Sequence, residues 1–356
     1  MKEIQYKKFS WDTHKKNLKL ESPSVCQFEL TFRCGLNCNY CYAICYNKPE
    51  YVQKELDTEQ VKFILDKVHK EGTLWLCFTG GDPLERGDFL DIYSYAKDKG
   101  FIISIFTNGY SMTEEIVDYL RKNPPFVIEV TLNAATRKTY EKISGINGSF
   151  EKTMKGIDLI LQGGLSLKIK TQVIKDNLEE LPKIKNFIEG LGLEFRPSSF
   201  LHARLDKDSS PCGLRISPEE VLNLNGKKLP NNDCKVLPKT EKLQPTIELF
   251  SCAIGGGDGI NIDPYGNLTP CNCLREPKAD LLKEDFEEAR NVILGWARSR
   301  RYITNSKCRD CLIREICYNC PGKAFLEMGN LEGQLDWFCE LANQGLARNA
   351  LHMKGI

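Results

Sequence analysis

Three cysteines lie close together near the start of the chain, where their spacing could hold a redox cofactor. Cys34, Cys38 and Cys41 form the pattern CxxxCxxC. Three thiolates can bind three irons of a [4Fe–4S] cluster and leave the fourth iron for a small molecule, whereas electron-transfer clusters use four cysteines. Structural zinc sites also use four ligands. Cys45 could supply a fourth thiolate, so zinc and a ferredoxin-like cluster remain alternatives at this point.

Polar and glycine residues follow three of the apolar runs that come next. Residues 80–82 read Gly-Gly-Asp, residues 107–109 Thr-Asn-Gly, and residues 131–133 Thr-Leu-Asn. A glycine pair permits positive φ and a close backbone approach to a ligand, and the acid after it could hold an ammonium group. Each group alone could be turn chemistry. Their shared place at the carboxyl ends of successive strands favours an active site, because parallel sheets place ligands there.

A second set of cysteines lies near the end of the chain. Residues 263–267 predict a hairpin turn, which would bring the cysteines on its two sides together on adjacent strands. Paired cysteine knuckles are also typical of zinc ribbons, so zinc is an alternative here too. The spacings are Cys252-x13-Gly266-x4-Cys271, Cys308-x2-Cys311-x5-Cys317-x2-Cys320, and an isolated Cys339.

The elements that must position these residues alternate along the first half of the chain. Strand-like runs cover 25–32, 74–79, 102–107, 127–132, 167–174 and 193–196, and amphipathic helices cover 58–70, 88–99, 113–122, 149–162 and 178–191. This alternation predicts an α/β fold with a parallel sheet, and six units are too few for a complete eightfold barrel. We divide the chain into 1–24, a barrel at 25–199, a connector at 200–251 with a helix at 217–223, a cysteine-rich domain at 252–340, and a C-terminal helix at 341–356.

Composition narrows the class of protein. The 356 residues include 49 Lys and Arg against 48 Asp and Glu, a net charge of +1, which argues against nucleic acid as the main partner. No apolar run approaches the length of a membrane helix, and the N-terminus has no apolar signal region. We therefore expect a cytoplasmic protein without a membrane partner, whose 16 cysteines serve metal or redox chemistry rather than disulfides.

The motifs between residue 25 and about residue 197 resemble the radical S-adenosylmethionine (SAM) superfamily. The resemblance implies a partial (β/α)6 TIM-like barrel and a [4Fe–4S] cluster whose open iron is chelated by SAM. It departs from the family pattern at Asp82, where Glu is usual, and at Asn133, where Asp is usual. Tyr40 would lie against the adenine, and the remaining implied cofactor-binding residues are Gly80, Gly81, Asp82, Asn108, Thr131 and Asn133.

The C-terminal cysteines resemble the SPASM domain, a module that carries auxiliary clusters, although the last spacing is x2 here where x3 is usual. The resemblance implies two auxiliary [4Fe–4S] clusters. One would be held by Cys308, Cys311, Cys317 and Cys339, and the other by Cys252, Cys271 and Cys320. Cys234 or Cys273 would complete the second set, with Cys212 a weaker candidate, unless an iron stays open for substrate.

One position bears on the choice of catalytic base. Some members of that family have Asp directly after the cysteine that matches Cys271, where it takes a substrate proton, and this chain has Asn272. Asp258 is an alternative base, or the reaction needs none there. Among the histidines, His202 lies near the expected barrel mouth, where with Arg196 and Arg204 it could bind an anionic group or play a structural part.

The resemblance implies an oxidoreductase that cleaves SAM to methionine and a 5′-deoxyadenosyl radical, which abstracts hydrogen from a peptide or protein during its maturation. One alternative is side-chain oxidation or decarboxylation of a tetrapyrrole, whose propionates would need several basic residues at the barrel mouth. Another is a zinc-stabilised interaction protein. A flavodoxin- or ferredoxin-type electron donor is expected. Because only about 25 residues precede the first strand, we expect either a separate leader-peptide recognition protein or a substrate without a leader.

Overall fold

The computed structural model describes residues 5–43, 47–224, 247–252, 259–314 and 317–353. Cys45, Cys234 and Asp258, three of the residues considered above, lie outside these ranges. Within them, no helix is both long and apolar enough to cross a membrane.

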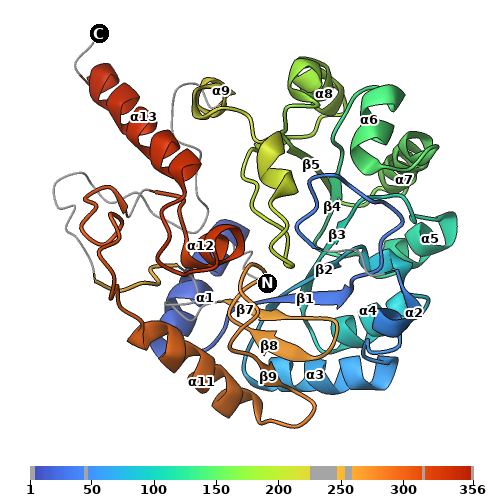
Figure 1. Ribbon diagram of the computed structural model, residues 1–356. Coiled ribbons are helices and arrows are strands. Elements are labelled where there is room, and N and C mark those ends of the chain that lie inside the picture. The colour runs from blue at the N-terminus through green and yellow to red at the C-terminus, as the bar shows by residue number, and fades with distance from the viewer. Residues whose placement is uncertain (1–4, 44–46, 225–246, 253–258, 315–316, 354–356) are drawn as a thin grey trace.

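Across the described residues, a single nine-stranded sheet organises the structure, in the order β6-β5-β4-β3-β2-β1-β7-β8-β9. Its first six strands are parallel and curve into an open barrel (Figure 1). The structure therefore confirms the predicted α/β class and strand order, with ends that differ by a few residues. The strands are β1 Val25–Thr31, β2 Trp75–Gly80, β3 Ile102–Thr107, β4 Val127–Thr131, β5 Leu167–Gln172 and β6 Phe195–Ser198.

Helices cover the outer face of the barrel (Figure 1). Local sequence explains where several begin: Asp57 and Gln60 form a capping box at α3, and Thr113 caps α5. The sequence pattern missed α6 and joined a short 3₁₀ turn, η2 Leu178–Glu180, to α8. The helices are α2 Pro49–Val52, α3 Thr58–Lys70, α4 Phe89–Asp98, α5 Glu114–Lys122, α6 Arg137–Ser144, α7 Ser149–Gln162 and α8 Leu181–Gly190.

Alternation along the strands separates an apolar outer face from a polar barrel interior. In β1, Cys26, Phe28 and Leu30 belong to the main hydrophobic core. Glu29 and Thr31, which alternate with them, make polar contacts. Successive side chains of a strand point to opposite faces, so the acids of the strands face the lumen. The barrel interior is therefore lined by polar side chains, and the hydrophobic core packs on the outer face of the sheet.

The sheet continues beyond the predicted barrel. β7 Gly259–Ile262 pairs parallel with β1, and β8 Asn267–Thr269 and β9 Ala279–Asp280 add antiparallel strands. The predicted hairpin is present, and the Asp263 carboxylate closes it by accepting from the backbone N–H of Tyr265 at 2.9 Å. The boundary we drew at residue 252 thus separates two strands of one sheet.

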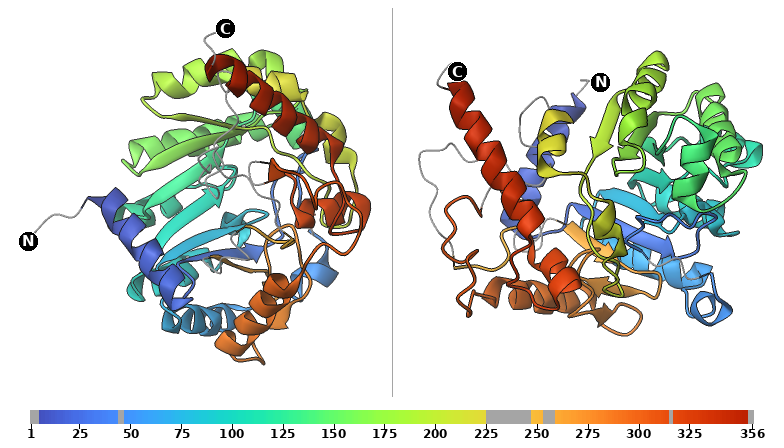
Figure 2. Two further views of the ribbon diagram at one scale, coloured as in Figure 1. Left: turned by 90° about the vertical axis from the view of Figure 1, so that its left-hand side faces the viewer. Right: turned by 45° about the horizontal axis from the view of Figure 1, so that its top comes forward.

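Helices α11 Phe286–Ser299, α12 Pro321–Met328 and α13 Asp336–Met353 lie on the other side of the barrel from α4 and α5 (Figure 1). In the connector, α9 Pro218–Leu224 packs against α13. The sequence did not predict α1 Tyr6–Leu20, which lies beside the sheet (Figure 2). Trp75, the first residue of β2, holds α1 by donating to the Tyr6 hydroxyl at 2.9 Å and by stacking on His14.

Candidate active site

The segment that leaves β1 carries the CxxxCxxC cysteines and is fixed by pairing with the end of α6. Asn37 N donates to Ser144 O at 2.8 Å, and Asn39 N donates to Ile143 O at 3.0 Å. These backbone bonds anchor the chain on both sides of Cys38, between Cys34 and Cys41. The three thiols are thereby held on one ordered segment at the carboxyl end of the sheet.

Arg204 holds the other end of this segment. Its guanidinium donates to the backbone carbonyls of Cys41 at 2.7 Å and Asn39 at 3.0 Å, and it pairs with Asp208 at 3.2 Å. We considered Arg204 as an anion-binding residue together with His202. The structure instead gives it a positioning role, because its donors are directed at the cysteine segment.

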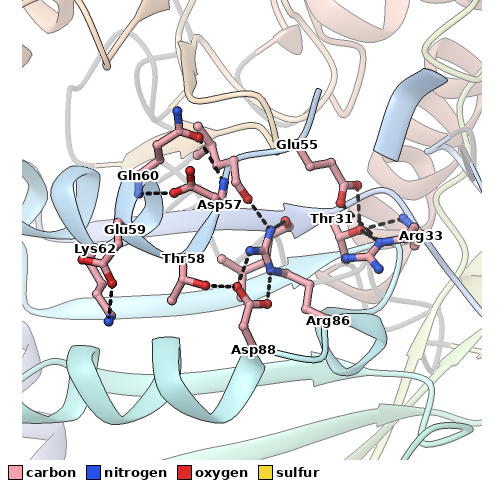
Figure 3. Close-up of polar contacts among 12 residues, drawn as sticks. Thr31, Arg33, Glu55, Asp57, Thr58, Glu59, Gln60, Lys62, Arg86 and Asp88 are labelled. Atoms are coloured by element: carbon pink, nitrogen blue, oxygen red, sulfur yellow. Dashed lines mark hydrogen bonds and ion pairs between the residues drawn. The ribbon is translucent and has the colours of Figure 1, made fainter. Parts of the chain in front are cut away.

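A polar network at the rim fixes how the chain leaves β1 (Figure 3). The Glu55 carboxylate accepts from the Thr31 hydroxyl at 2.7 Å and lies 3.3 Å from the Arg33 guanidinium. Arg86, almost fully buried, donates to backbone carbonyls at the end of β1 and before α3, and it pairs with Asp88. The network ties β1 to α3 on the side where the cysteine segment begins.

The glycine pair after β2 is required by the chain's own backbone. Gly80 has φ +131°, and a Cβ there would lie 2.1 Å from Thr31 O. A Cβ on Gly81 would lie 2.2 Å from Arg33 O. We interpreted these glycines as room for a ligand. The structure shows that they first make room for the strand that leads into the cysteine segment.

Asp82 is fully buried and joins the ends of β2 and β3. Its carboxylate accepts from the backbone N–H of Leu84 at 3.0 Å, from the Thr107 hydroxyl at 2.8 Å and from the backbone N–H of Asn108 at 2.8 Å. Burial raises the pKa of Asp82 to about 6, against the lowering effect of these hydrogen bonds. The geometry favours a positioning role, and contact with a SAM ammonium group stays a prediction.

Asn108 links Asp82 to the first cysteine. Its side-chain amide donates to the Sγ of Cys34 at 3.3 Å, while its Oδ1 accepts from the backbone N–H of Tyr110 at 2.8 Å. The side chain is therefore fixed at both ends, and its donor points at a sulfur. Hydrogen-bond donors to the sulfur atoms of an iron–sulfur cluster tune the reduction potential of that cluster.

Tyr40 and Asn133 meet across the rim. The Asn133 amide donates to the Tyr40 hydroxyl at 2.6 Å, and its Oδ1 accepts from the backbone N–H of Gln172 at 2.9 Å. Burial raises the pKa of Tyr40 well above its ordinary value, and the nearby Cys38 and Cys41 add a smaller rise in the same direction. The predicted cofactor residues thus gather at one rim. Thr131, the last residue of β4, is half-buried there.

Two ion-pair groups line the barrel interior. Arg275 contacts the carboxylate of Glu29 at 2.5 and 2.9 Å, and the Tyr42 hydroxyl donates to the same carboxylate at 3.3 Å. On the opposite wall, Glu129 pairs with Lys170 and lies 4.0 Å from Arg196. Sequence reasoning singled out only Arg196 among these. A charged residue inside an apolar strand was the signal for Glu29, Glu129 and Lys170, whereas Tyr42 and Arg275 lie outside the strands. Together these groups make the barrel interior polar.

Four of the predicted auxiliary ligands surround one cavity. Cys308, Cys311, Cys317 and Cys339 line a space of about 230 Å³ in the C-terminal region. Asn319 supports two of them, because its backbone N–H donates to Cys317 Sγ at 3.4 Å and its amide reaches Cys308 Sγ at 3.6 Å. Residues up to 31 positions apart are thereby brought around one point, as the proposed ligand set requires.

The second predicted set gathers beside a neighbouring cavity of about 220 Å³. Cys252 and Cys320 line this cavity, and Cys271 packs with Cys252 against the same hydrophobic cluster. The structure brings these cysteines together outside the strands, whereas we expected Cys252 and Cys271 on adjacent strands. Cys273 contacts Cys271, and its thiol donates to Asn272 Oδ1 at 3.5 Å.

No disulfide joins any two of the described cysteines. Within the described ranges, no three Cys, His, Asp or Glu side chains converge closely enough to hold a single metal ion. A [4Fe–4S] cluster is larger than an ion and takes one thiolate per iron, so its ligands stand farther apart. Thiol-rich sets of this kind fit iron–sulfur clusters and not hard cations such as Mg²⁺, which take oxygen ligands.

Comparison with known proteins agrees with this geometry. Residues 28–188 match the model of the Radical SAM superfamily. The chain is 26% identical over 330 residues to an AdoMet-dependent heme synthase of Methanosarcina barkeri, covering 87% of this chain and 94% of that protein. It is 28% identical over 292 residues to the PqqA peptide cyclase of Granulibacter bethesdensis, covering 81% of this chain and 66% of that protein.

Among solved structures, Streptococcus suis SuiB bound to its precursor peptide SuiA has the same fold. The TM-score is 0.70 at 17% identity, over 93% of this chain and 80% of that chain. With 93% of this chain covered, this likeness in fold extends well beyond residues 28–188. With its SAM-type motifs at the rim of a parallel barrel, the chain carries a Radical SAM superfamily domain at residues 28–188, and a domain of this superfamily implies an enzyme that uses SAM and a [4Fe–4S] cluster.

Proposed function

We propose that the protein reductively cleaves SAM and uses the resulting 5′-deoxyadenosyl radical to abstract hydrogen from a peptide or protein substrate. The observation that carries the proposal is the CxxxCxxC segment, fixed at the carboxyl end of the barrel with Asn108 directed at Cys34. The peptide assignment is supported by the PqqA peptide cyclase among the relatives and by the fold shared with SuiB in complex with SuiA.

Cys34, Cys38 and Cys41 would hold the first cluster, which supplies the electron that breaks the carbon–sulfur bond of SAM. The protein's part is to hold this site in one geometry. Asp82 fixes Asn108, which is directed at Cys34, and Asn133 fixes Tyr40. Rigid positioning of these groups directs a reactive radical to one target.

We further propose two auxiliary [4Fe–4S] clusters in the C-terminal region. The first would be held by Cys308, Cys311, Cys317 and Cys339, and the second by Cys252, Cys271 and Cys320. A flavodoxin- or ferredoxin-type protein would supply electrons.

The test begins with purified, oxygen-free protein that has been reconstituted with iron and sulfide. It should contain roughly twelve irons if three four-iron clusters form, and with a strong reductant it should release 5′-deoxyadenosine from SAM. Cys38→Ala should abolish release, and Cys77→Ala is the matched control, because Cys77 lies within β2. A colourless, zinc-loaded protein that leaves SAM intact would instead indicate a zinc-stabilised interaction protein.

Oxidation or decarboxylation of a tetrapyrrole is the second candidate. It is favoured by the AdoMet-dependent heme synthase among the relatives and by the basic side chains Lys170, Arg196 and Arg275 in the barrel interior. Each of these is paired with an acid, which leaves less positive charge for a ring of propionates than unpaired bases would. Incubation with an iron porphyrin that carries propionates, followed by mass spectrometry for loss of CO₂, separates this candidate from peptide modification.

A further inference from the structure

Cys273 lies in a tight turn that also carries Cys271. The backbone N–H of Leu274 donates to Cys271 O at 3.2 Å, which closes the turn directly after β8. Cys273 is buried, with 8% of its surface exposed, and packs with Ala203 and Leu326 in a small cluster that Cys271 also touches. The turn therefore presents two thiols to the same part of the C-terminal region.

The first turn of α12 brings Cys320 to the same place. Cys320 is the N-cap residue of α12, and its Sγ accepts from the backbone N–H of Lys323 at 3.4 Å. Two residues later, a Cβ on Gly322 would lie 3.2 Å from the Cβ of Cys273. The N-terminus of a helix favours negative charge, so it suits thiolates. Cys252 lies across the adjoining cavity from Cys320.

His202 faces the thiol of Cys273. Its Nε2 lies 3.3 Å from Cys273 Sγ, and its Nδ1 is fixed by the backbone carbonyl of Ala203 at 2.8 Å. The imidazole also packs against Tyr42, with ring centroids 5.7 Å apart. Because both sides of the ring are held, His202 sets the direction of the Cys273 sulfur.

Cys212 is the natural comparison, because it touches the same small cluster. Its thiol is directed elsewhere. A hydrogen bond to Glu327 engages it, and Glu327 in turn pairs with Arg215. Cys212 therefore shares the neighbourhood of Cys273 but not its orientation toward Cys271.

We propose that Cys273 is the fourth thiolate of the auxiliary cluster held by Cys252, Cys271 and Cys320, and that His202 is a positioning residue for it. This inference rests on the auxiliary clusters of the proposed function and specifies one of them. With four thiolates, every iron of that cluster has a protein ligand. The site then has no open iron for substrate, which places substrate chemistry at the first cluster alone.

The test isolates this site in the full chain. A background variant carries Cys34→Ala, Cys38→Ala, Cys41→Ala, Cys308→Ala and Cys311→Ala, and is reconstituted with iron and sulfide without oxygen. We expect about four irons to remain. Adding Cys273→Ala should expose one iron, so mild oxidation should give a three-iron cluster with its own EPR signal and about one quarter less iron.

Cys212→Ala in the same background should leave both the iron content and the EPR spectrum unchanged. Cys273→Ser, which keeps an oxygen ligand and the side-chain volume, should keep all the iron with an altered spectrum, and it serves if the alanine variant folds poorly. The proposal is overturned if Cys273→Ala matches the background, if Cys212→Ala produces the loss, or if the background binds no iron.

His202 is tested by spectroscopy, because a merely structural role would leave the cluster unchanged. His202→Ala should alter the EPR spectrum and the reduction potential at constant iron content, and His202→Asn should restore part of the change. Unaltered spectra would remove His202 from the proposal. A wild-type chain that leaves SAM intact would refute the proposed function while the iron result still stood.

Discussion

The Arg275 guanidinium contacts the fully buried carboxylate of Glu29 through two nitrogen atoms, at 2.5 and 2.9 Å. Glu29 lies in the central strand β1, and Arg275 follows the cysteine turn of the C-terminal region. This pair therefore fastens the region of the predicted auxiliary clusters to the interior of the barrel.

Arg275→Met should destabilise the protein by about 3 kcal/mol, because it leaves a carboxylate buried without its partner. Glu29→Gln together with Arg275→Met should recover part of the loss, since neither side then carries a charge. Denaturant unfolding measures both changes. Arg121→Met is the control, because Arg121 and Asp118 form an exposed pair that should contribute below about 1 kcal/mol. Equal losses for Arg275→Met and Arg121→Met would contradict the assignment.

Gly80→Ala should be severely destabilising, by more than about 4 kcal/mol, or prevent folding. The new Cβ would collide with Thr31 O, which is backbone and cannot rotate away, and φ at this position is +131°. Gly87→Ala is matched to it, because nothing lies within 4 Å of a Cβ at that position. Soluble yield and thermal unfolding of the two variants should differ sharply, and similar behaviour would show that the strands can separate at no cost.

Asn108→Ala should slow SAM cleavage about 10- to 100-fold, the usual effect of losing a hydrogen bond to a metal ligand. The variant should still bind the cluster, because the three cysteines are intact, and its EPR spectrum should change with the lost donor to Cys34. Asn123→Ala, at the end of α5, is the control and should cleave SAM at the normal rate. An unchanged rate in Asn108→Ala would show that the amide does not act on the cluster.

Asp82 should make stability depend on pH. Its pKa is raised by burial to about 6 in the folded protein, so the folded state binds the proton more tightly than the unfolded chain does. The contribution is then full below pH about 4 and is lost as pH rises through about 6.

The difference in unfolding free energy between the metal-free protein and Asp82→Asn should therefore fall by roughly 2 kcal/mol from pH 4 to 7. The asparagine does not titrate, and the other ionisable groups cancel in the difference. Parallel stability curves for the two proteins would mean that Asp82 has the same pKa in the folded and unfolded states.

The local sequence pattern was sufficient to predict the parts of the site that lie within one continuous segment of the chain. The CxxxCxxC spacing, the glycine pair and the strand–helix alternation from β1 to β6 are all written in consecutive residues. Strand ends were displaced by a few residues, because the last residues of a strand are decided by pairing with a neighbour. The helix α6 was missed because its residues, Arg137–Ser144, are mostly polar and give little apolar periodicity.

Sequence alone determined that this chain carries three thiols at the carboxyl end of a parallel sheet and a second group of cysteines near its end. Only the tertiary structure decided that β7 extends the barrel sheet, that Arg275 pairs with Glu29 246 positions away, and that Cys273 faces His202. Each of these depends on how the sheet curves and on where the C-terminal region packs. Contacts between distant segments depend on the whole packed core and leave no local periodicity to read.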